Sequence, residues 1–167
     1  MKVFVIAILL SLFAIAAGAQ TPKDAKYLIK IKGVGLGASY GQVIKAFGKP
    51  KKETTSDGDE CRGGKLRSME YDGLAIDLYL YDDDANAQFN VGMIEITDPK
   101  WLASGLKIGQ PLSTVTAKLG QPTSKEPGRL KREILRHYNF GESDGPGNTM
   151  LTFRNGKLHK ITSFYIC

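Results

Sequence analysis

The chain has 167 residues, enough for one compact domain or for two small halves that share a hydrophobic core. It carries 23 Lys and Arg against 17 Asp and Glu, a formal net charge of +6. An excess of this size suits an acidic partner but does not indicate nucleic acid. The densest basic stretch, 125–136, is expected to be a solvated strand edge, where charge discourages aggregation.

The first 19 residues are typical of a secretory signal peptide. Lys2 supplies the basic region, 3–16 are almost purely apolar, and Ala17 and Ala19 provide small residues before a cleavage site at Gln20. The apolar stretch is shorter than the ~20 residues of a membrane span, and no later segment is long and apolar enough. We therefore expect a periplasmic or secreted mature protein, without nucleic acid as a partner. The residue directly after the cleavage site is Gln20 and not a cysteine, so no lipid anchor at the new N-terminus is expected.

The next signal is a pair of similar segments, 36–50 and 108–122, that align without a gap at an offset of 72 residues. Apolar residues at helical spacing predict a short helix in each. We expect Ser39 to cap the first helix and Pro111 to suit the first turn of the second. The glycines that follow the helices are predicted to end them in the left-handed conformation. The residue types shared by both copies are Gly37, Val43, Gly48 and Pro50, matched by Gly109, Val115, Gly120 and Pro122.

Alternating patterns after each helix predict four strands. In the first copy these are 51–56, 66–71, 74–81 and 91–97, and in the second 123–125, 134–138, 148–154 and 157–166. Asn155-Gly156 predicts a hairpin between the last two. Leu130, Ile134 and Tyr138 also fit a helical spacing, but a strand is favoured because the first copy has one there.

The pattern predicts an α+β fold of two tandem repeats, each a helix followed by a four-stranded antiparallel meander, packed into one compact unit. Repeat 1 spans 20–98 and repeat 2 spans 99–167. Each meander has one apolar face for its helix to cover, and the other face is expected to be open to solvent.

The repeated glycine, valine and proline pattern resembles the tandem-repeat fold of β-lactamase inhibitory proteins. It is also similar to the small outer-membrane assembly lipoproteins of the SmpA/OmlA type, although this chain lacks a lipidation cysteine and has two copies where those proteins resemble one. The resemblance implies a protein-binding sheet or a role in envelope assembly. Its residues are structural, so it carries over no inhibitor contacts.

Cys61 and Cys167 are the only cysteines. An even count in an exported chain favours a disulfide between them, with two free thiols as the alternative. No close Cys/His cluster suggests a metal site. The acidic run 82–86 has the alternating oxygens of a calcium loop, but Ala87 and Met93 stand where such a loop needs Gly and Glu. We expect an acidic loop there, and neither a metal nor a cofactor.

The third strand of the first copy suggests the binding surface. Tyr79 and Tyr81 alternate with leucines that face the helix, so they are expected on the outer face as anchors for a protein partner. Matching the copies places Phe164 on the same side. The alternative is lateral packing of these rings between strands.

Little in the sequence indicates catalysis. His137 and His159 lie on expected strands and belong to no recognisable nucleophile motif. The leading interpretation is therefore an exported module that binds a protein of the cell envelope, such as an inhibitor of an envelope enzyme. The alternatives are a scaffold in envelope assembly or maintenance and, least favoured, a small hydrolase. The sequence does not indicate the oligomeric state.

Overall fold

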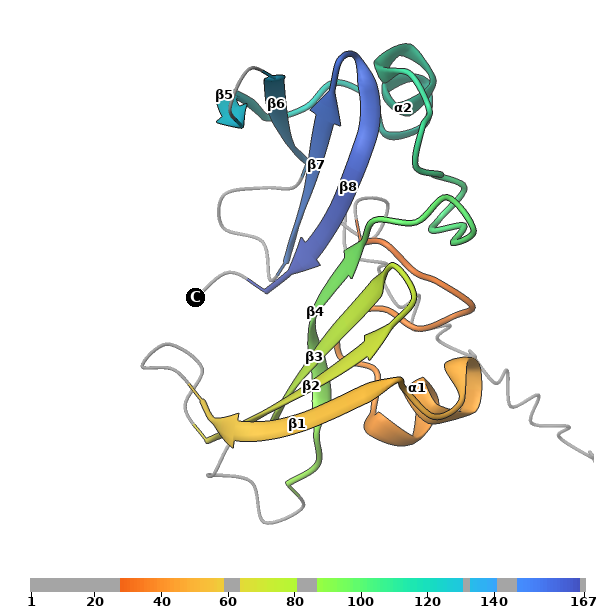
Figure 1. The fold of residues 1–167 in the computed structure, drawn as a ribbon, viewed down its shortest axis with the longest axis vertical. Helices are drawn as coiled ribbons and strands as arrows, with labels where there is room; N and C mark the ends of the chain where they lie inside the picture. Colours follow the sequence, from red (N-terminus) through yellow and green to blue (C-terminus); the bar gives the residue numbers. More distant parts are fainter. Residues whose placement is uncertain (1–27, 59–63, 81–86, 131–132, 141–146, 166–167) are drawn as a thin grey trace, which may run out of the picture.

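The computed structural model describes residues 28–58, 64–80, 87–130, 133–140 and 147–165. The expected signal peptide lies outside these residues. In chain order the elements are α1 (Tyr40–Phe47), β1 (Lys52–Asp57), β2 (Lys65–Tyr71), β3 (Leu74–Leu80), β4 (Asn90–Ile96), α2 (Leu112–Leu119), β5 (Ser124–Leu130), β6 (Glu133–Phe140), β7 (Asn148–Arg154) and β8 (Lys157–Phe164) (Figure 1).

The eight strands form one antiparallel sheet in the order β1-β2-β3-β4-β8-β7-β6-β5. The two meanders are joined because β4 pairs with β8, with Met93 opposite Phe164 and Ile96 opposite Ile161. The expected α+β fold of two packed helix-plus-meander repeats is therefore wrong: each helix has only eight residues, and the fold is mainly β. Pairing β4 with β8 satisfies backbone groups that two separate sheets would each expose at an edge.

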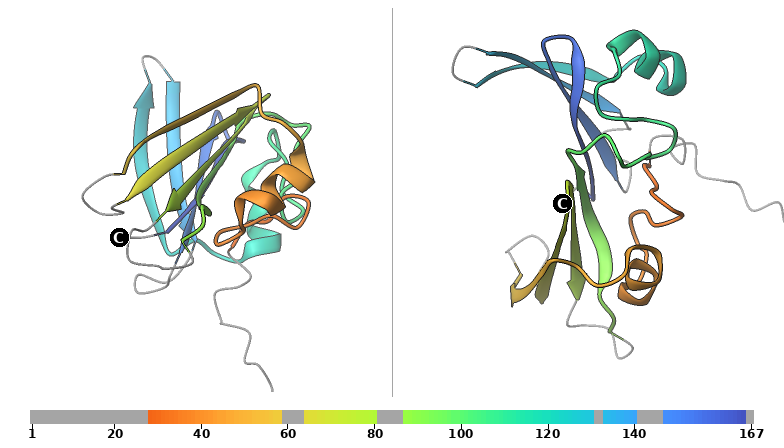
Figure 2. Two further views of the ribbon diagram at one scale, coloured as in Figure 1. Left: turned by 90° about the horizontal axis from the view of Figure 1, so that it is seen from below. Right: turned by 45° about the vertical axis from the view of Figure 1, so that its right-hand side comes forward.

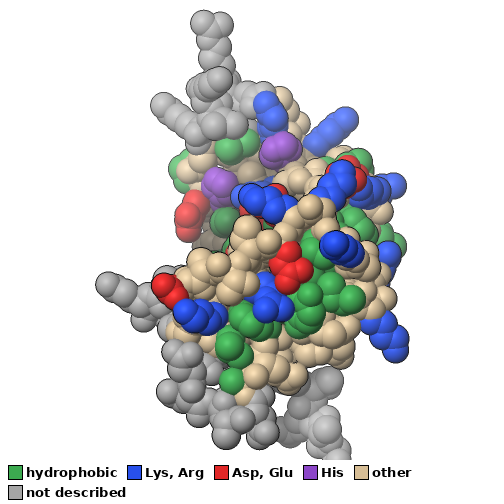
Figure 3. Space-filling model, turned by 60° about the horizontal axis from the view of Figure 1, so that its bottom comes forward, with side chains coloured by type: hydrophobic (Ala, Val, Ile, Leu, Met, Phe, Trp, Pro, Cys, Tyr) green, Lys and Arg blue, Asp and Glu red, His purple; other side chains and the backbone are tan. Residues whose placement is uncertain are grey.

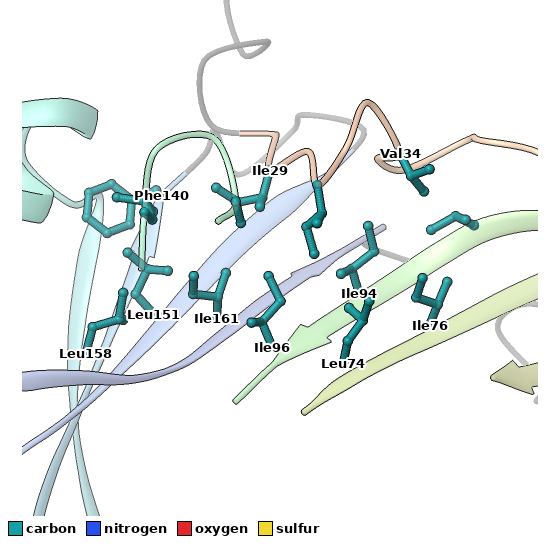
Figure 4. Packing of buried hydrophobic residues seen from close by; sticks show 14 of the residues in the cluster. Ile29, Val34, Leu74, Ile76, Ile94, Ile96, Phe140, Leu151, Leu158 and Ile161 are labelled. Carbon is teal, nitrogen blue, oxygen red and sulfur yellow. The ribbon is translucent and has the colours of Figure 1, made fainter. Parts of the chain in front are cut away.

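The hydrophobic core lies on one side of this sheet. Figure 2 shows α1, α2 and the segments leading into them on that side. Ile96 and Ile161, opposite each other across the β4–β8 junction, are both fully buried, and Ile29 from the segment before α1 belongs to the same cluster (Figure 4). The core therefore continues across the junction, and both halves of the sheet share it.

The segments that precede the two helices have the same local geometry. Each contains a tight hairpin, with bridges between Ile31 and Val34 and between Ala103 and Leu106. The hairpins contact each other, because the Ser104 N–H donates to the Lys30 carbonyl over 2.9 Å and the Lys30 N–H donates to Ser104 Oγ over 3.0 Å. These contacts connect the two halves on the helix side.

The helix ends partly follow the sequence expectations. Ser39 caps α1 in a capping box with Gln42. Pro111 occupies the N-cap of α2 rather than its first turn and forms no side-chain cap. Gly48 and Gly120 end the helices at φ 76° and 85°, but with ψ near −163°, so the predicted left-handed helical conformation is wrong. This region is open essentially to glycine alone, which explains the residue type.

Strand β6 resolves the ambiguity between helix and strand, since the segment around Ile134 and Tyr138 pairs with β5 and β7. The Asn155-Gly156 hairpin is confirmed, with φ of 51° and 77° at its two turn residues. Within the described residues, no helix is long and apolar enough to cross a membrane.

Candidate functional site on the open face of the sheet

The candidate site is the face of the sheet turned away from α1 and α2, which we call the open face (Figures 1 and 2). No described helix covers it. At its centre three half-buried apolar side chains lie on adjacent strands: Met93 on β4, Phe164 on β8 and Met150 on β7. Met93 lies directly opposite Phe164 in the strand register. Flexible methionines beside an aromatic ring form an adaptable apolar surface.

An ion pair borders this cluster and crosses between the two halves of the sheet. Lys160 Nζ on β8 lies 3.0 Å from Glu95 Oε2 on β4, and each side chain is about one third exposed. Thr162 on β8 lies opposite Glu95 of β4 on one side and opposite Met150 of β7 on the other. The Thr162 hydroxyl is buried and has no hydrogen-bond partner among the described residues. The centre of the open face thus combines apolar, charged and hydrogen-bonding groups.

The structure places the two histidines in different surroundings, His137 beside a threonine hydroxyl and His159 at the surface. His137 Nδ1 lies 3.0 Å from Thr152 Oγ1, its partner in the β6–β7 register. Its ring lies over Gly128 on β5, where an added Cβ would be 2.5 Å from the His137 Nε2. His159 is exposed, and Figure 3 shows the two rings as separate surface side chains. The contacts of His137 therefore account for its position structurally.

Tyr79 does not have the exposure expected of a binding anchor. Only 3% of it is exposed, so its assignment as an outward anchor is wrong. Tyr79 pairs with Asn90 on β4, and its ring lies over the nearby Gly92, which has no side chain. Lateral packing between strands, the alternative interpretation, is what the structure shows for this residue. Tyr81 lies outside the described residues, whereas Phe164 is half-buried on the open face.

Several other predicted features lie outside the described residues. These are Cys61 and Cys167, whose disulfide stays a prediction, and the acidic run 82–86. Among the residues that the structure describes, no group of three or more His, Cys, Asp or Glu side chains could hold a metal ion.

Sequence reasoning missed Met93, Met150, Glu95 and Lys160. The signal was present in part, because Met93 and Glu95 alternate with the buried Ile94 and Ile96 on β4. Alternation alone does not reveal that β4 lies beside β8, and that pairing places these side chains together.

In the view of Figure 3, hydrophobic side chains form several small groups among charges of both signs. Leu102, 61% exposed, is the large apolar side chain that stands out in the described part of the chain. On the face seen in Figure 3, apolar side chains are therefore interspersed with charged ones. Such a surface is typical of partners that also exist free in solution.

Comparison with known proteins finds likeness in structure but not in sequence. No protein-family model matches the chain. A search of curated proteins also finds no match. An extracellular protein containing an SCP domain from Bacillus anthracis is similar with a TM-score of 0.49 and 8% identity, over 78% of this chain and 44% of that one. The chain thus spans less than half the length of that protein.

Two further solved structures are similar to this chain. A candidate β-lactamase inhibitor protein from Streptococcus mutans aligns with a TM-score of 0.31 and 19% identity, over 81% of this chain and 90% of that one. A DUF4309 family protein from Bacillus subtilis aligns with a TM-score of 0.41 and 14% identity, over 77% of this chain and 78% of that one. At these scores and identities the likenesses assign no function to the chain.

Proposed function

We propose that this chain is an exported protein-binding module that binds a protein partner on the open face of its sheet. The observation that carries the proposal is the composition of that face. Half-buried Met93, Phe164 and Met150 lie at its centre, beside the ion pair of Glu95 and Lys160, and no described helix covers them. An apolar centre with charged groups at its border is the usual arrangement of a protein interface.

The buried Thr162 hydroxyl adds to this argument. A buried polar group without a partner is costly, and a partner group or a water molecule that reached it would recover part of that cost. Thr162 lies between Glu95 and Met150 in the register, so a partner that contacts these two side chains would lie directly over it.

The proposed compartment comes from the N-terminal sequence. A basic residue, an apolar stretch and Ala17-Gly18-Ala19 before Gln20 support export with cleavage of the signal peptide. The partner is then a protein outside the cytoplasm. Inhibition of an envelope enzyme is the form of binding that the sequence resemblance implies, and we propose no catalytic role for the chain.

The test is capture of a partner from the native cell envelope by the tagged mature protein, followed by measurement of the affinity for the purified partner. We expect Met93→Glu to weaken that affinity at least tenfold, because it places a charge at the apolar centre. The matched control is Lys45→Glu on the exposed side of α1, away from the open face. The control should bind as the original chain does.

Thermal melts of both variants ensure that a loss of binding is not a loss of folding. Phe164→Ser provides a second probe of the same cluster. A partner that binds Met93→Glu and Phe164→Ser with unchanged affinity would place the interface elsewhere. If the partner is an enzyme, its activity in the complex distinguishes an inhibitor from a scaffold.

A further inference from the structure

Two arginines occupy corresponding positions in the two halves of the sheet. Arg67 on β2 lies opposite Leu78, and Arg136 on β6 lies opposite Phe153. Leu78 and Phe153 correspond because each directly follows a register irregularity in the pairing of its strand with the next one. Both arginines therefore lie on the helix side, and each is on a strand two places from the junction strand of its half.

The residues just before β4 and β8, the last strands of the two halves, also correspond. Val91 and Leu158 each accept a hydrogen bond from the N–H of the glycine that precedes the helix of the same half, over 2.8 and 2.7 Å. Counting back two residues from each makes Phe89 correspond to Gly156. Tyr40 and Leu112 correspond as the first residues of α1 and α2.

In the first half the chain itself fills the space around the arginine. The Cζ of Arg67 lies 4.7 Å from the centroid of the Tyr40 ring and 4.2 Å from that of Phe89. Glu53 balances its charge, with Oε1 at 3.6 Å from Arg67 Nη1. The guanidinium is thus held between two rings and beside a carboxylate, an arrangement that favours a partly buried cation.

In the second half both rings are missing. Leu112 stands in place of Tyr40, and Gly156 stands in place of Phe89. A cavity of about 290 Å³ occupies this space. An apolar cavity of roughly 150 Å³ is known to hold a benzene molecule, so one aromatic ring fits. The cavity is lined by Leu112, Arg136, Tyr138, Phe153, Asn155 and Gly156.

The carboxylate is missing as well. Lys125 occupies the position in the second half that Glu53 occupies in the first. Glu53 pairs with Met69, two residues after Arg67. Lys125 pairs with Tyr138, two residues after Arg136. A second cation therefore replaces the anion of the first half, with Lys125 Nζ 5.8 Å from the centroid of the Tyr138 ring. Neither Lys125 nor Arg136 forms an ion pair with a described carboxylate.

We infer that this cavity binds an aromatic side chain of a protein partner that carries a carboxylate beside the ring. The partner supplies what the first half supplies from within: a ring against the guanidinium of Arg136 and a negative charge for Arg136 and Lys125. The floor is ready for a ring, because Tyr138 and Phe153 are buried and pack edge to face at 5.2 Å. This site lies on the helix side and is independent of the open face.

The test uses N-acetyl-phenylalanine as a probe of ring and carboxylate, titrated into the full mature chain and followed by the NMR shifts of backbone amides. We expect shifts centred on Leu112, Phe153 and Gly156. N-acetyl-phenylalanine amide, which lacks the charge, and N-acetyl-leucine, which lacks the ring, should each bind about tenfold more weakly. Absence of shifts at these residues, or equal binding of all three probes, would overturn the inference.

Variants that introduce the residues of the first half at the corresponding positions of the second half test the inference further. Leu112→Tyr should block the cavity with an internal ring and abolish the shifts. Lys125→Glu should lower the affinity for N-acetyl-phenylalanine about tenfold but leave the affinity for the amide probe unchanged. Lys118→Gln is the matched control for lost charge, since its ammonium lies beside Gly105 rather than at the cavity, and it should bind both probes normally.

Arg136→Gln tests the same cavity if Leu112→Tyr does not fold. It should also lower the affinity for N-acetyl-phenylalanine. Unchanged binding by Arg136→Gln, or an equal loss with Lys118→Gln, would show that the charge of the chain and not this cavity attracts the probe. Met93→Glu on the open face should bind the probe as the original chain does. A failure of this site is thereby distinguished from a failure of the proposed function.

Discussion

The ring of Tyr79 on β3 covers Gly92 on β4, so closely that a Cβ added at Gly92 would lie 2.2 Å from the Tyr79 Cδ2. The pairing of these strands is irregular at this point, with Asp77 opposite Met93 and Leu78 opposite Val91. Gly92 is therefore the extra residue of a β-bulge, and the aromatic ring covers backbone that has no side chain of its own.

Replacing the covering ring should destabilise the fold. We expect Tyr79→Ala to lower the free energy of unfolding by about 3–5 kcal/mol, the usual cost of removing a buried aromatic side chain. Urea denaturation of the mature protein measures this. Gly92→Ala should cost about 1–3 kcal/mol, because the new methyl group displaces the ring. A loss below about 1 kcal/mol for Tyr79→Ala would mean that the ring does not pack as described.

Tyr71 should make stability depend on pH under alkaline conditions. Burial, followed by the nearby charges of Glu53 and Tyr40, raises the pKa of Tyr71 from 10.0 to about 12. Its hydroxyl donates to the Gly48 carbonyl over 3.0 Å. Because the folded-state pKa lies above the unfolded value, the stabilisation is complete below pH 10 and is lost as the pH rises towards 12.

The measurement compares the original chain with Tyr71→Phe. The variant should lose about 1 kcal/mol at neutral pH through the missing hydrogen bond. Its unfolding free energy should then fall less steeply between pH 10 and 12. Identical slopes in both proteins would contradict the raised pKa.

The Glu95–Lys160 pair should couple the two halves only weakly. Both side chains are about one third exposed, so we expect a coupling energy of about 0.5–1 kcal/mol that decreases at high salt. Glu95→Lys should destabilise the sheet by opposing two lysines across the junction, and adding Lys160→Glu should restore most of the loss. A double-mutant cycle in urea at low and high salt measures the coupling energy. A coupling energy of zero at low salt would mean that Glu95 and Lys160 do not interact across the junction.

The sequence also predicts the covalent state of the mature protein. We expect intact mass measurement of the exported product to show an N-terminus at Gln20 with no acyl chain. Thiol titration of the denatured, unreduced protein should detect no free cysteine, because Cys61 and Cys167 are predicted to be bonded. Two reactive thiols, or a mass that retains residues 1–19, would contradict these expectations.

Local sequence patterns predicted both helices and the presence of eight strands, although the strand expected at 123–125 extends over Ser124–Leu130 and the hairpins before the helices were missed. The apolar spacing around Val43 and Val115 predicts both helices, and the alternation along 74–80 predicts the third strand of the first half. Asn155-Gly156 predicts its hairpin correctly. These features depend on residues a few positions apart, whose backbone conformation and nearest hydrogen bonds are determined by side-chain type.

The tertiary structure alone decided how the elements combine. The pairing of β4 with β8 turns two meanders into one sheet and places Met93 beside Phe164, although 71 positions separate them in the chain. The same long-range register buries Tyr79 over Gly92 and leaves a cavity beside Arg136 where the first half has rings. Alternation specifies which side chains share a face of a strand, but the neighbour of that strand is selected by the packing and hydrogen bonding of the whole sheet.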